Sequence, residues 1–255
     1  MILTQKELER YSRHIMLEEI GVSGQQKLMD AKVLLIGAGG LGSPVAMYLA
    51  AAGIGTIGIA DADVVDLSNL QRQIIHTTAD LGRKKVESAA ETMRAINPEI
   101  KVQAYGTFVS SENIKDLIKE YDFIIDATDN FESKFLINDA CVLAKKPYSH
   151  AGILGFQGQL MTYVPGVGAC YRCIFKEPPK KEDSTGGAVG IIGAVAGVIG
   201  CLQATEAVKY IVGAGELLTG QVLTYDALKM KFRSVKLPKD ESCAVCGVHP
   251  VITEL

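Results

Sequence analysis

The stretch KVLLIGAGGLG, residues 32–42, decides the fold class of this chain. Its first five residues form an apolar run of strand length, and Gly37, Gly39 and Gly42 complete the pattern G-x-G-x-x-G. An apolar pattern with helical period follows over residues 43–52, and a second short apolar run covers residues 56–60. A strand, a glycine turn, a helix and a second strand form a βαβ unit. The stretch therefore predicts an α/β fold built on a parallel sheet with helices on both faces.

The same alternation continues outward from this unit in both directions. Residues 4–30 read as helical, with Thr4 as a possible N-cap and Glu7 at the capping-box position. Periodicity and breakers predict three further helices and five further strands. The predicted helices are 82–96, 110–120 (with Ser110 as its cap) and 131–144, and the predicted strands are 101–105, 123–126, 148–151, 157–164 and 220–226.

These elements predict one domain over residues 1–255. We expect a helical segment at 1–30 and a Rossmann-like nucleotide-binding core at 31–165, with a mainly parallel sheet. Residues 166–255 are expected to add a zinc site, a mobile loop at 174–187, a buried helix and C-terminal strands. The last strands, from 157 onward, are predicted to be antiparallel. The sequence thus predicts a Rossmann-like sheet extended by antiparallel strands and a C-terminal structural zinc site.

The composition is that of an ordinary soluble protein, with 48% hydrophobic and 22% charged residues and a net charge of -3. This charge argues against nucleic acid or an anionic membrane as a partner. Residues 1–9 lack the apolar core of a secretion signal, so we expect a cytoplasmic protein. Residues 186–205 carry no charge, but they are rich in Gly and Ala rather than Leu, Ile and Phe. We interpret them as a helix buried in the protein rather than a membrane span.

The glycine loop predicts a nucleotide-binding site. Glycines let the backbone approach phosphates, and the helix that follows supplies N–H donors and a partial positive charge. Asp61 ends the next strand, 22 positions after Gly39, where a carboxylate can bind a ribose hydroxyl. This fingerprint alone also fits NAD, and a tight structural turn could produce the same pattern.

Charged residues beyond the glycine loop favour ATP over NAD. A triphosphate that releases pyrophosphate needs cations to neutralise the growing charge, usually with magnesium held by a carboxylate. Arg72, Lys85 and Asp129 can supply these groups, and all three follow predicted strands. Lys84 and Lys85 open a predicted helix, where cations oppose the helix dipole, so they suggest a nearby anion. The structural alternatives are an exposed helix start for the lysines and an ordinary turn for Asp126 and Asp129.

Three spaced motifs together resemble the MoeB/ThiF family, relatives of the ubiquitin-activating enzymes. They are GAGGLG at 37–42, D-x-D-x-V-x-x-S-N-L-Q-R-Q at 61–73 and DATDN at 126–130. The segment RYSRH at 10–14 and two C-x-x-C pairs extend the resemblance over nearly the whole chain. The family resemblance implies a homodimeric adenylyltransferase that uses ATP and magnesium.

The resemblance also implies roles for individual residues. The glycine loop with Gly40 and Leu41 would lie against the nucleotide, and Asp61, in the motif that includes Asp63, would bind the ribose. Asn69 and Arg72 would hold the triphosphate, and Lys85 would contact the phosphates. Asp129 would bind magnesium beside Asn130, and Arg13 would reach the active site of the partner subunit. The catalytic residues implied in this way are Asp129, Arg72, Lys85 and Arg13.

The implied reaction is activation of the C-terminal Gly-Gly carboxylate of a ubiquitin-like sulfur-carrier protein. Attack by the carboxylate on the α-phosphorus of ATP yields an acyl adenylate and pyrophosphate. Positioning and charge neutralisation supply most of the catalysis, and no protein base is required because the carboxylate is already ionised. Such carriers serve the thiamine and molybdopterin pathways. Other interpretations are a relative that adenylates a tRNA base modification, an NAD-dependent oxidoreductase and a non-catalytic scaffold.

Four cysteines predict a structural zinc site. Cys170/Cys173 and Cys243/Cys246 are two C-x-x-C pairs, and a shell of four thiolates leaves no open position for water. Redox-active pairs or an iron–sulfur cluster are the alternatives. Cys141 and Cys201 sit singly in apolar helical patterns and are expected to be buried.

One feature departs from the family. Several relatives carry a cysteine in the loop before the Gly/Ala-rich helix, and the matching place here is near Gly186, where the sequence has none. We therefore expect the enzyme to stop at the acyl adenylate, which an external sulfur donor then attacks.

Overall fold

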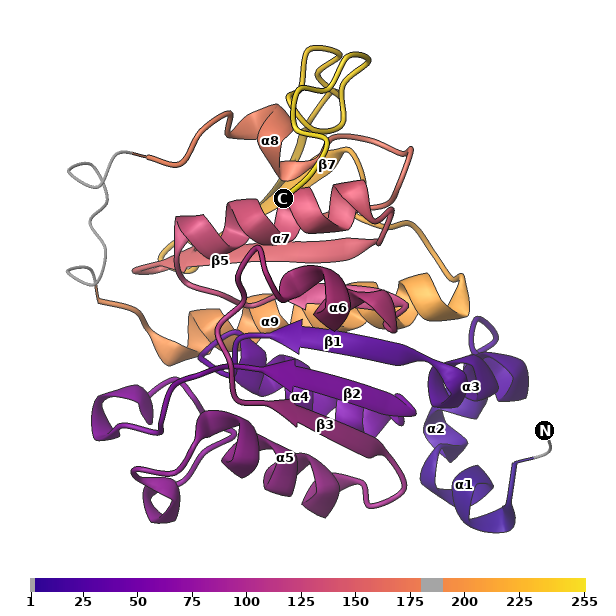
Figure 1. Cartoon of the computed structure of the whole chain (residues 1–255). Coiled ribbons are helices and arrows are strands. Elements are labelled where there is room, and N and C mark those ends of the chain that lie inside the picture. Colours follow the sequence, from indigo (N-terminus) through magenta and orange to yellow (C-terminus); the bar gives the residue numbers. More distant parts are fainter. Residues whose placement is uncertain (1–2, 180–189) are drawn as a thin grey trace.

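An eight-stranded sheet runs through the computed structural model, which describes residues 3–179 and 190–255 (Figure 1). The strands are β1 (Lys32–Ile36), β2 (Thr56–Ala60), β3 (Lys101–Tyr105), β4 (Phe123–Asp126), β5 (Tyr148–Leu154), β6 (Gln157–Tyr163), β7 (Gln221–Asp226) and β8 (Lys231–Lys236). Their order is β3-β2-β1-β4-β5-β6-β7-β8. The first five strands are parallel, and β6, β7 and β8 are antiparallel. The predicted sheet is confirmed, and β8 is an additional strand.

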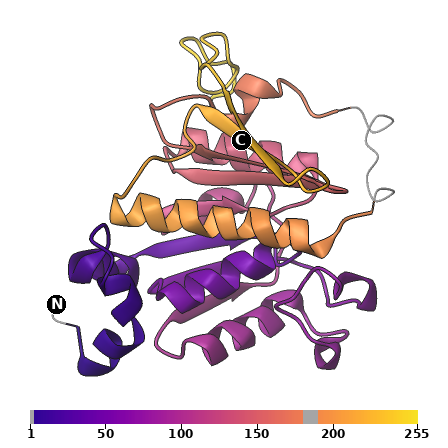
Figure 2. The same cartoon turned by 180° about the vertical axis from the view of Figure 1, so that it is seen from behind.

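Helices cover both faces of this sheet, as the sequence predicts. Figure 1 shows α6 (Ile114–Lys119) and α7 (Phe131–Leu143) in front of the sheet. The opposite view in Figure 2 brings α4 (Gly42–Ala52), α5 (Lys85–Ile96) and α9 (Gly193–Val212) to the front. Strand order reverses between β1, which neighbours β2, and β4, which neighbours β5. In an open α/β sheet, ligands bind outside the carboxyl ends of the strands at such a switch point.

The N-terminal segment is helical but interrupted. It contains α1 (Gln5–Arg10), α2 (Ser12–Ile15) and α3 (Gly21–Asp30). The predicted capping box at the start of α1 is confirmed, since Thr4 and Glu7 satisfy each other's backbone N–H groups. Gly21 at the start of α3 has a φ of 56°, a conformation that glycine adopts without strain.

The helices predicted to start at residues 82 and 110 begin later than the sequence indicates. Residues 82–84 are not helical because they pair with the preceding loop, where Val65 donates to the carbonyl of Arg83 and accepts from Gly82 N–H. The predicted Ser110 cap is wrong. The side chain of Asn113 folds back to accept a hydrogen bond from Ser110 N–H at 2.9 Å, so helix α6 starts only at Ile114.

The C-terminal part contains a short helix that the sequence analysis did not predict, α8 (Tyr171–Ile174). Its length of one turn leaves no readable period. Strand β5 continues three residues beyond its predicted end at Ala151, because it pairs with β6 as far as the Leu154↔Gln157 pair. Short 3₁₀ turns lie at Leu67–Asn69 and Thr78–Asp80 in the long segment after β2.

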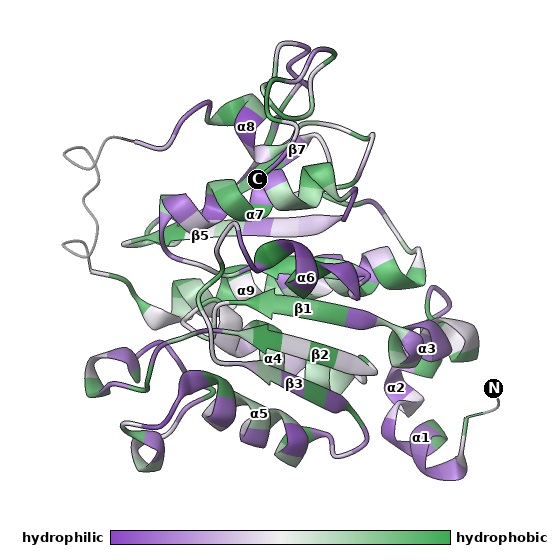
Figure 3. Ribbon diagram, viewed as in Figure 1, coloured by the Kyte–Doolittle hydropathy of each residue, from purple (hydrophilic) through white to green (hydrophobic). Residues whose placement is uncertain are grey.

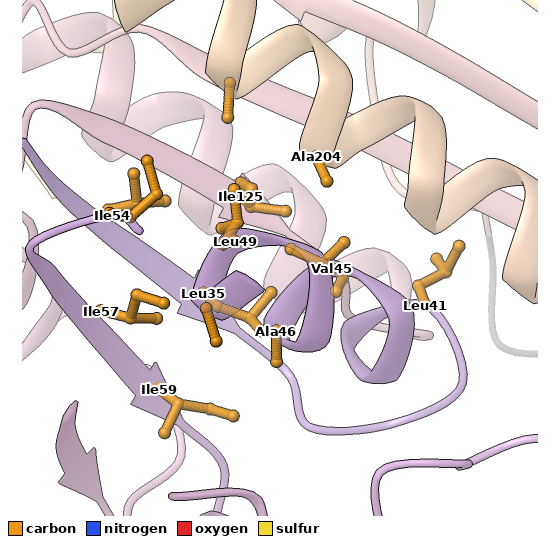
Figure 4. Close-up of a cluster of buried hydrophobic side chains, with 14 of the residues drawn as sticks. Leu35, Leu41, Val45, Ala46, Leu49, Ile54, Ile57, Ile59, Ile125 and Ala204 are labelled. Carbon is orange, nitrogen blue, oxygen red and sulfur yellow. The ribbon is translucent and has the colours of Figure 1, made fainter. Parts of the chain in front are cut away.

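The main hydrophobic core lies between the sheet and the layer formed by α4, α5 and α9. Figure 4 shows Leu35, Ile57 and Ile125 of the sheet facing Val45 and Leu49 of α4, with Ala204 of α9 beside them. Green hydrophobic ribbon is concentrated in the central strands and in α9, whereas α1 and α5 carry more purple polar residues (Figure 3). The apolar helix predicted over residues 186–205 is thus a core helix of this fold, but residues 190–192 are not helical, and the helix runs from Gly193 to Val212. Among the described residues, α9 is the one helix long and apolar enough to cross a membrane, and half of its most apolar stretch is buried within the protein.

Small residues allow α9 to approach α4 closely. A Cβ atom at Gly200 would lie 2.5 Å from the carbonyl oxygen of Leu41 and 2.5 Å from Cγ of Pro44. At Gly197, one turn earlier, a Cβ atom would meet no atom of the described residues within 4 Å. These two glycines therefore form a matched pair for testing the helix contact.

We expect Gly200→Ala to lower the free energy of unfolding by about 1–3 kcal/mol, because the added methyl group overlaps backbone and proline atoms. Gly197→Ala should instead leave stability unchanged or raise it by up to about 1 kcal/mol, since alanine favours the helix. Urea unfolding of both variants measures the difference. Equal stabilities would show that α9 and α4 do not pack as described.

Candidate functional site

The loops that follow β1, β2 and β4 meet at the carboxyl edge of the sheet. Gly37 has a φ of 103°, and a Cβ atom there would lie 2.7 Å from the carbonyl oxygen of Ala127. A Cβ atom at Gly40 would lie 3.3 Å from Cγ of Arg72. Glycine is therefore needed at Gly37 both for its backbone angle and for its contact with the β4 loop. These contacts bring three of the predicted motifs together.

Two side chains fix the glycine loop through hydrogen bonds to the backbone of Ala38. The Asp61 carboxylate accepts a hydrogen bond from Ala38 N–H at 2.8 Å and another from Asp63 N–H at 2.8 Å. On the other side of the same residue, His76 Nε2 donates to the carbonyl oxygen of Ala38 at 3.0 Å. Both backbone groups of Ala38 are thus hydrogen-bonded, and the loop conformation is fixed. A fixed loop is what phosphate binding by backbone N–H groups requires.

His76 is held as a neutral imidazole. The side chain is buried, and its Nδ1 atom lies 2.8 Å from the hydroxyl of Ser88. Burial lowers the pKa of His76 below its ordinary value of 6.5, and the nearby positive charge of Lys85 lowers it further. A neutral ring with the proton on Nε2 satisfies both contacts, since the Ser88 hydroxyl can donate to Nδ1.

The two predicted phosphate-binding cations lie in the loop after β2 and at the start of α5. The ammonium group of Lys85 is almost fully buried and lies 2.8 Å from a carboxylate oxygen of Asp63, which is itself half exposed. Arg72 donates from Nη1 to the carbonyl oxygen of Ser68 at 3.1 Å, and its aliphatic stem lies against Gly40. Asn69 lies on the same 3₁₀ turn, one residue after Ser68. The buried charge of Lys85 and the half-buried charge of Arg72 thus lie beside the glycine loop.

Asp129 and Asn130 follow β4 at the same edge, and both are exposed. The Asn130 side chain caps α7 by accepting a hydrogen bond from Ser133 N–H at 2.8 Å. Asp129 has no hydrogen bond or ion pair to any side chain in the part of the chain that the structure describes. Its carboxylate is therefore free to bind a ligand, and its chemistry suits magnesium.

Arg13 lies elsewhere. It belongs to α2, which packs near the amino ends of the strands, at the opposite end of the sheet from the glycine loop (Figure 1). Its guanidinium contacts Met16 Sδ at 3.9 Å and is exposed. A single chain does not bring Arg13 to the site.

The four predicted cysteine ligands come together between α8 and the C-terminal segment. Their sulfur atoms all lie within 4.8 Å of one another, and the closest pairs are 3.4, 3.7 and 4.0 Å apart. Four sulfurs placed about 2.3 Å from a tetrahedral zinc ion would be about 3.8 Å apart. The separations are also too long for disulfides. The cluster therefore has the donor set and spacing that suit zinc.

The surroundings of the cluster stabilise one thiolate, that of Cys173. Asp240 N–H lies 3.5 Å from Cys173 Sγ, and hydrogen bonds from the Cys170 and Cys246 thiols lower the pKa of Cys173, whereas the pKa values of Cys170 and Cys246 are raised by hydrogen bonding within the cluster and by burial. Arg172, inside the first C-x-x-C pair, forms two hydrogen bonds of 2.6 and 2.7 Å with the carboxylate of Asp139 in α7. The cluster is thereby tied to the helix that starts beside Asp129.

A groove of about 480 Å³ opens next to the Arg72 loop. It runs between the β5–β6 turn and the start of α9, where Gly193 packs against the backbone of Gln71 and Arg72. Its lining residues are Gln71, Gly155, Phe156, Gly190, Ile191, Ile192 and Gly193. The groove therefore leads from the protein surface to the carboxyl edge.

Sequence reasoning did not identify several polar residues that support the site. His76, Lys134 and His150 are buried beneath or behind the loops. Each stands alone in the sequence, without a motif that would separate it from a core residue. The one available signal is the position of Lys134 in the first turn of α7, where a cation opposes the helix dipole.

Comparison with known proteins agrees with this geometry. A model of the ThiF family matches residues 11–245. The chain is 47% identical over 255 residues to the adenylyltransferase and sulfurtransferase MOCS3 of Aedes aegypti, covering 99% of this chain and 58% of that protein. It is 49% identical over 262 residues to the probable adenylyltransferase/sulfurtransferase MoeZ of Mycobacterium tuberculosis (strain H37Rv), covering 99% and 64%. The chain thus spans about three fifths of the length of these relatives.

Solved structures show the same fold. The crystal structure of E. coli MccB with ATP superposes with a TM-score of 0.83 and 28% identity, over 93% of this chain and 74% of that chain. MccB with MccA-N7isoASN gives a TM-score of 0.84 and 27% identity, over 94% and 74%.

The neutral state of His76 makes the site sensitive to acid. The pKa of His76 is lowered in the folded state. The contribution of neutral His76 to the free energy of unfolding is therefore complete above the ordinary pKa value of 6.5 and is lost as the pH falls below it. We expect the melting temperature to fall between about pH 7.5 and about pH 5.5, and to fall less in His76→Gln, which keeps a donor for Ala38 but cannot titrate. An equal fall in both proteins, measured by differential scanning fluorimetry, would show that His76 does not cause it.

Proposed function

The chain belongs to the ThiF family, and on that premise we propose that it uses ATP to adenylate a carboxylate. The observation that carries the proposal is the set of groups beside the glycine loop. Lys85 and Arg72 supply positive charge, and Asp129 supplies a carboxylate without a protein partner among the described residues. Two cations and a metal-binding carboxylate suit a triphosphate better than the two phosphates of NAD.

Each site residue then has a role. The glycine loop, including Gly39, Gly40, Leu41 and Gly42, places its backbone and the start of α4 against the phosphates. Asp61 orients the loop and binds the ribose at its exposed side. Magnesium held by Asp129 would neutralise charge on the phosphates. Lys85 exchanges its contact with Asp63 for a phosphate oxygen, and Arg72 and Asn69 hold the departing pyrophosphate.

The chemistry needs little beyond this positioning. An ionised carboxylate oxygen attacks the α-phosphorus, and the bond to the β-phosphate oxygen breaks. The products are an acyl adenylate and pyrophosphate. No proton is transferred, so the absence of a general base from the proposed set of residues is consistent with the reaction.

For the substrate, we propose the C-terminal Gly-Gly carboxylate of a ubiquitin-like sulfur-carrier protein. The groove beside Arg72 is open to solvent and has a volume of about 480 Å³, which gives room for an extended, small-residue tail. Around its mouth, the β5–β6 and β7–β8 turns lie side by side, joined by a hydrogen bond from Ala227 N–H to the carbonyl of Phe156. Exposed apolar side chains gather on these turns: Leu154, Phe156, Leu228, Met230 and Phe232. Such a patch suits a folded protein partner better than a free small molecule.

The relatives are named adenylyltransferase and sulfurtransferase, which supports a sulfur-carrier substrate. We propose that an external donor supplies the sulfur, because the sequence around Gly186 has no cysteine. That segment lies outside the described residues. We also propose that the chain acts as a homodimer in which Arg13 completes the site of the partner subunit. Within one chain, Arg13 lies at the opposite end of the sheet from the glycine loop.

We further propose that the four-cysteine cluster binds zinc with a structural role. The shell of Cys170, Cys173, Cys243 and Cys246 leaves no position for a substrate. The cluster joins the C-terminal segment to α8, and α8 to α7 through Arg172 and Asp139. Metal binding would thus stabilise the part of the fold that carries Asp129.

The test of adenylation is ATP–pyrophosphate exchange with magnesium and a purified carrier ending in Gly-Gly. We expect carrier-dependent exchange that falls by about 100-fold or more in Asp129→Ala, because a metal-binding charge at the phosphates is lost. Asp116→Ala is the matched control, since Asp116 is an exposed aspartate of α6 at the amino edge of the sheet. Exchange that persists in Asp129→Ala would refute its role. No exchange with any carrier, despite a thermal shift with ATP but not NAD, would indicate another carboxylate substrate.

For the zinc site, we expect purified protein to contain about one zinc ion per chain and to lose several degrees of melting temperature on chelation. Cys243→Ser should lose the metal, whereas Cys201→Ser, outside the cluster, should keep it. Elemental analysis by mass spectrometry decides between zinc and iron. Metal-free protein of unchanged stability would contradict a structural metal site.

A further inference from the structure

A buried ionic cluster lies directly behind the Asp129 loop, and the proposed reaction does not use it. Asp126 is the last residue of β4, and its side chain has no exposed surface. Its carboxylate lies 3.2 Å from Lys134 Nζ and 2.8 Å from His150 Nδ1. A buried charge is costly unless partners compensate it, so this cluster requires a strong structural reason.

The cluster joins four elements. Lys134 comes from α7 and also donates to the carbonyl oxygen of Ala151 in β5 at 2.7 Å. His150 belongs to β5, and Gln203 of α9 donates to the backbone carbonyl of Asp126 at 2.9 Å. The Lys134 charge holds Asp126 ionised and lowers its pKa, whereas burial lowers the pKa of His150 and keeps it neutral. One ion pair thus balances the charge at the end of β4.

The same carboxylate shapes the loop that carries Asp129. Its Oδ1 atom accepts hydrogen bonds from Thr128 N–H at 3.0 Å and from the Thr128 hydroxyl at 2.6 Å. This is a turn in which an Asp side chain replaces a backbone acceptor. Lys134 is the fourth residue of α7, four positions after the Asn130 cap. Residues 127–130 are therefore bracketed by an ion pair between Asp126 before them and Lys134 after them.

We propose that Asp126, fixed by Lys134, is a positioning residue that sets the place of the Asp129 carboxylate at the active site. The inference rests on the proposed function. Asp129 has no side-chain partner of its own among the described residues, so its place depends on the turn at Thr128 and on the start of α7. A shift of about 1 Å in a reacting geometry can cost about 100-fold in rate. The other interpretation, in which the ion pair only anchors α7 to the sheet, predicts a loss of stability without a specific loss of rate.

Removing Asp126 or Lys134 would leave a buried charge unpaired and could prevent folding. Thr128→Val is a milder probe, because it removes one donor to Asp126 while keeping the size and charge of the turn. Thr128→Ser restores the hydroxyl. Thr162→Val is the matched control, since the Thr162 hydroxyl donates at 2.6 Å to the equally buried carboxylate of Glu206, away from the Asp129 loop.

The experiment measures kcat and KM for carrier-dependent pyrophosphate exchange and the magnesium concentration that gives half the maximal rate. We expect Thr128→Val to lower kcat about tenfold and to raise the magnesium requirement, with KM for the carrier changed by less than about twofold. Thr128→Ser should restore kcat to within about twofold of the wild type, and Thr162→Val should lower only the melting temperature. Wild-type kcat and magnesium dependence in Thr128→Val would overturn the positioning role.

A second readout does not depend on turnover. Amide hydrogen exchange of residues 127–130 should become faster in Thr128→Val but not in Thr162→Val, because only the former loosens the turn. If the wild type itself shows no pyrophosphate exchange with any carrier, the proposed carrier substrate fails, and amide exchange then tests the positioning role separately. Unchanged protection of residues 127–130 in Thr128→Val would then overturn it.

Discussion

The close contact between Gly37 and Ala127 is the constraint on which the rest of the site depends. A side chain at Gly37 would overlap the carbonyl of Ala127, so β1 and β4 can leave the sheet side by side only if this position is glycine. From that contact the β1 loop turns into α4, and the β4 loop turns toward α7. The glycine loop, for which we propose phosphate binding, and the Asp129 carboxylate therefore reach the same edge from the strands on the two sides of the switch point.

The hydrogen bonds around this contact use backbone groups on both sides. Ala38 is held through its N–H by Asp61 and through its carbonyl by His76, and Thr128 is held by Asp126. Of the side chains that fix the loops, His76 and Asp126 are buried and Asp61 is half-buried, whereas Asp129, assigned to the ligand, is exposed. Buried partners of this kind explain why an exposed polar loop can hold one geometry.

The sequence predicted the elements with a clear period and failed where tertiary contacts override it. Strands β1 to β4 were predicted at their observed bounds because β1, β2 and β4 are short apolar runs followed by a turn, and β3 alternates polar and apolar residues. The start of α6 was wrong because the Asn113 side chain closes a turn that periodicity does not show. The four cysteines were predicted to converge because their spacing is specific to metal sites. Lys134 and His150 could not be predicted, since their partner Asp126 is eight and 24 residues away and no local pattern links them.

Strand β8 has a consequence for how the molecule avoids pairing with other copies of itself along the edge of the sheet. It is the outermost strand of the sheet, all of its residues are exposed, and no strand of residues 3–179 and 190–255 pairs with one side of its backbone. Such an edge can recruit another strand and lead to aggregation. Its sequence, however, carries Lys231, Arg233 and Lys236 and no acidic residue. Two copies that paired along β8 would bring like charges together in any register. Electrostatic repulsion between these basic side chains therefore disfavours pairing of two molecules at this edge of the sheet.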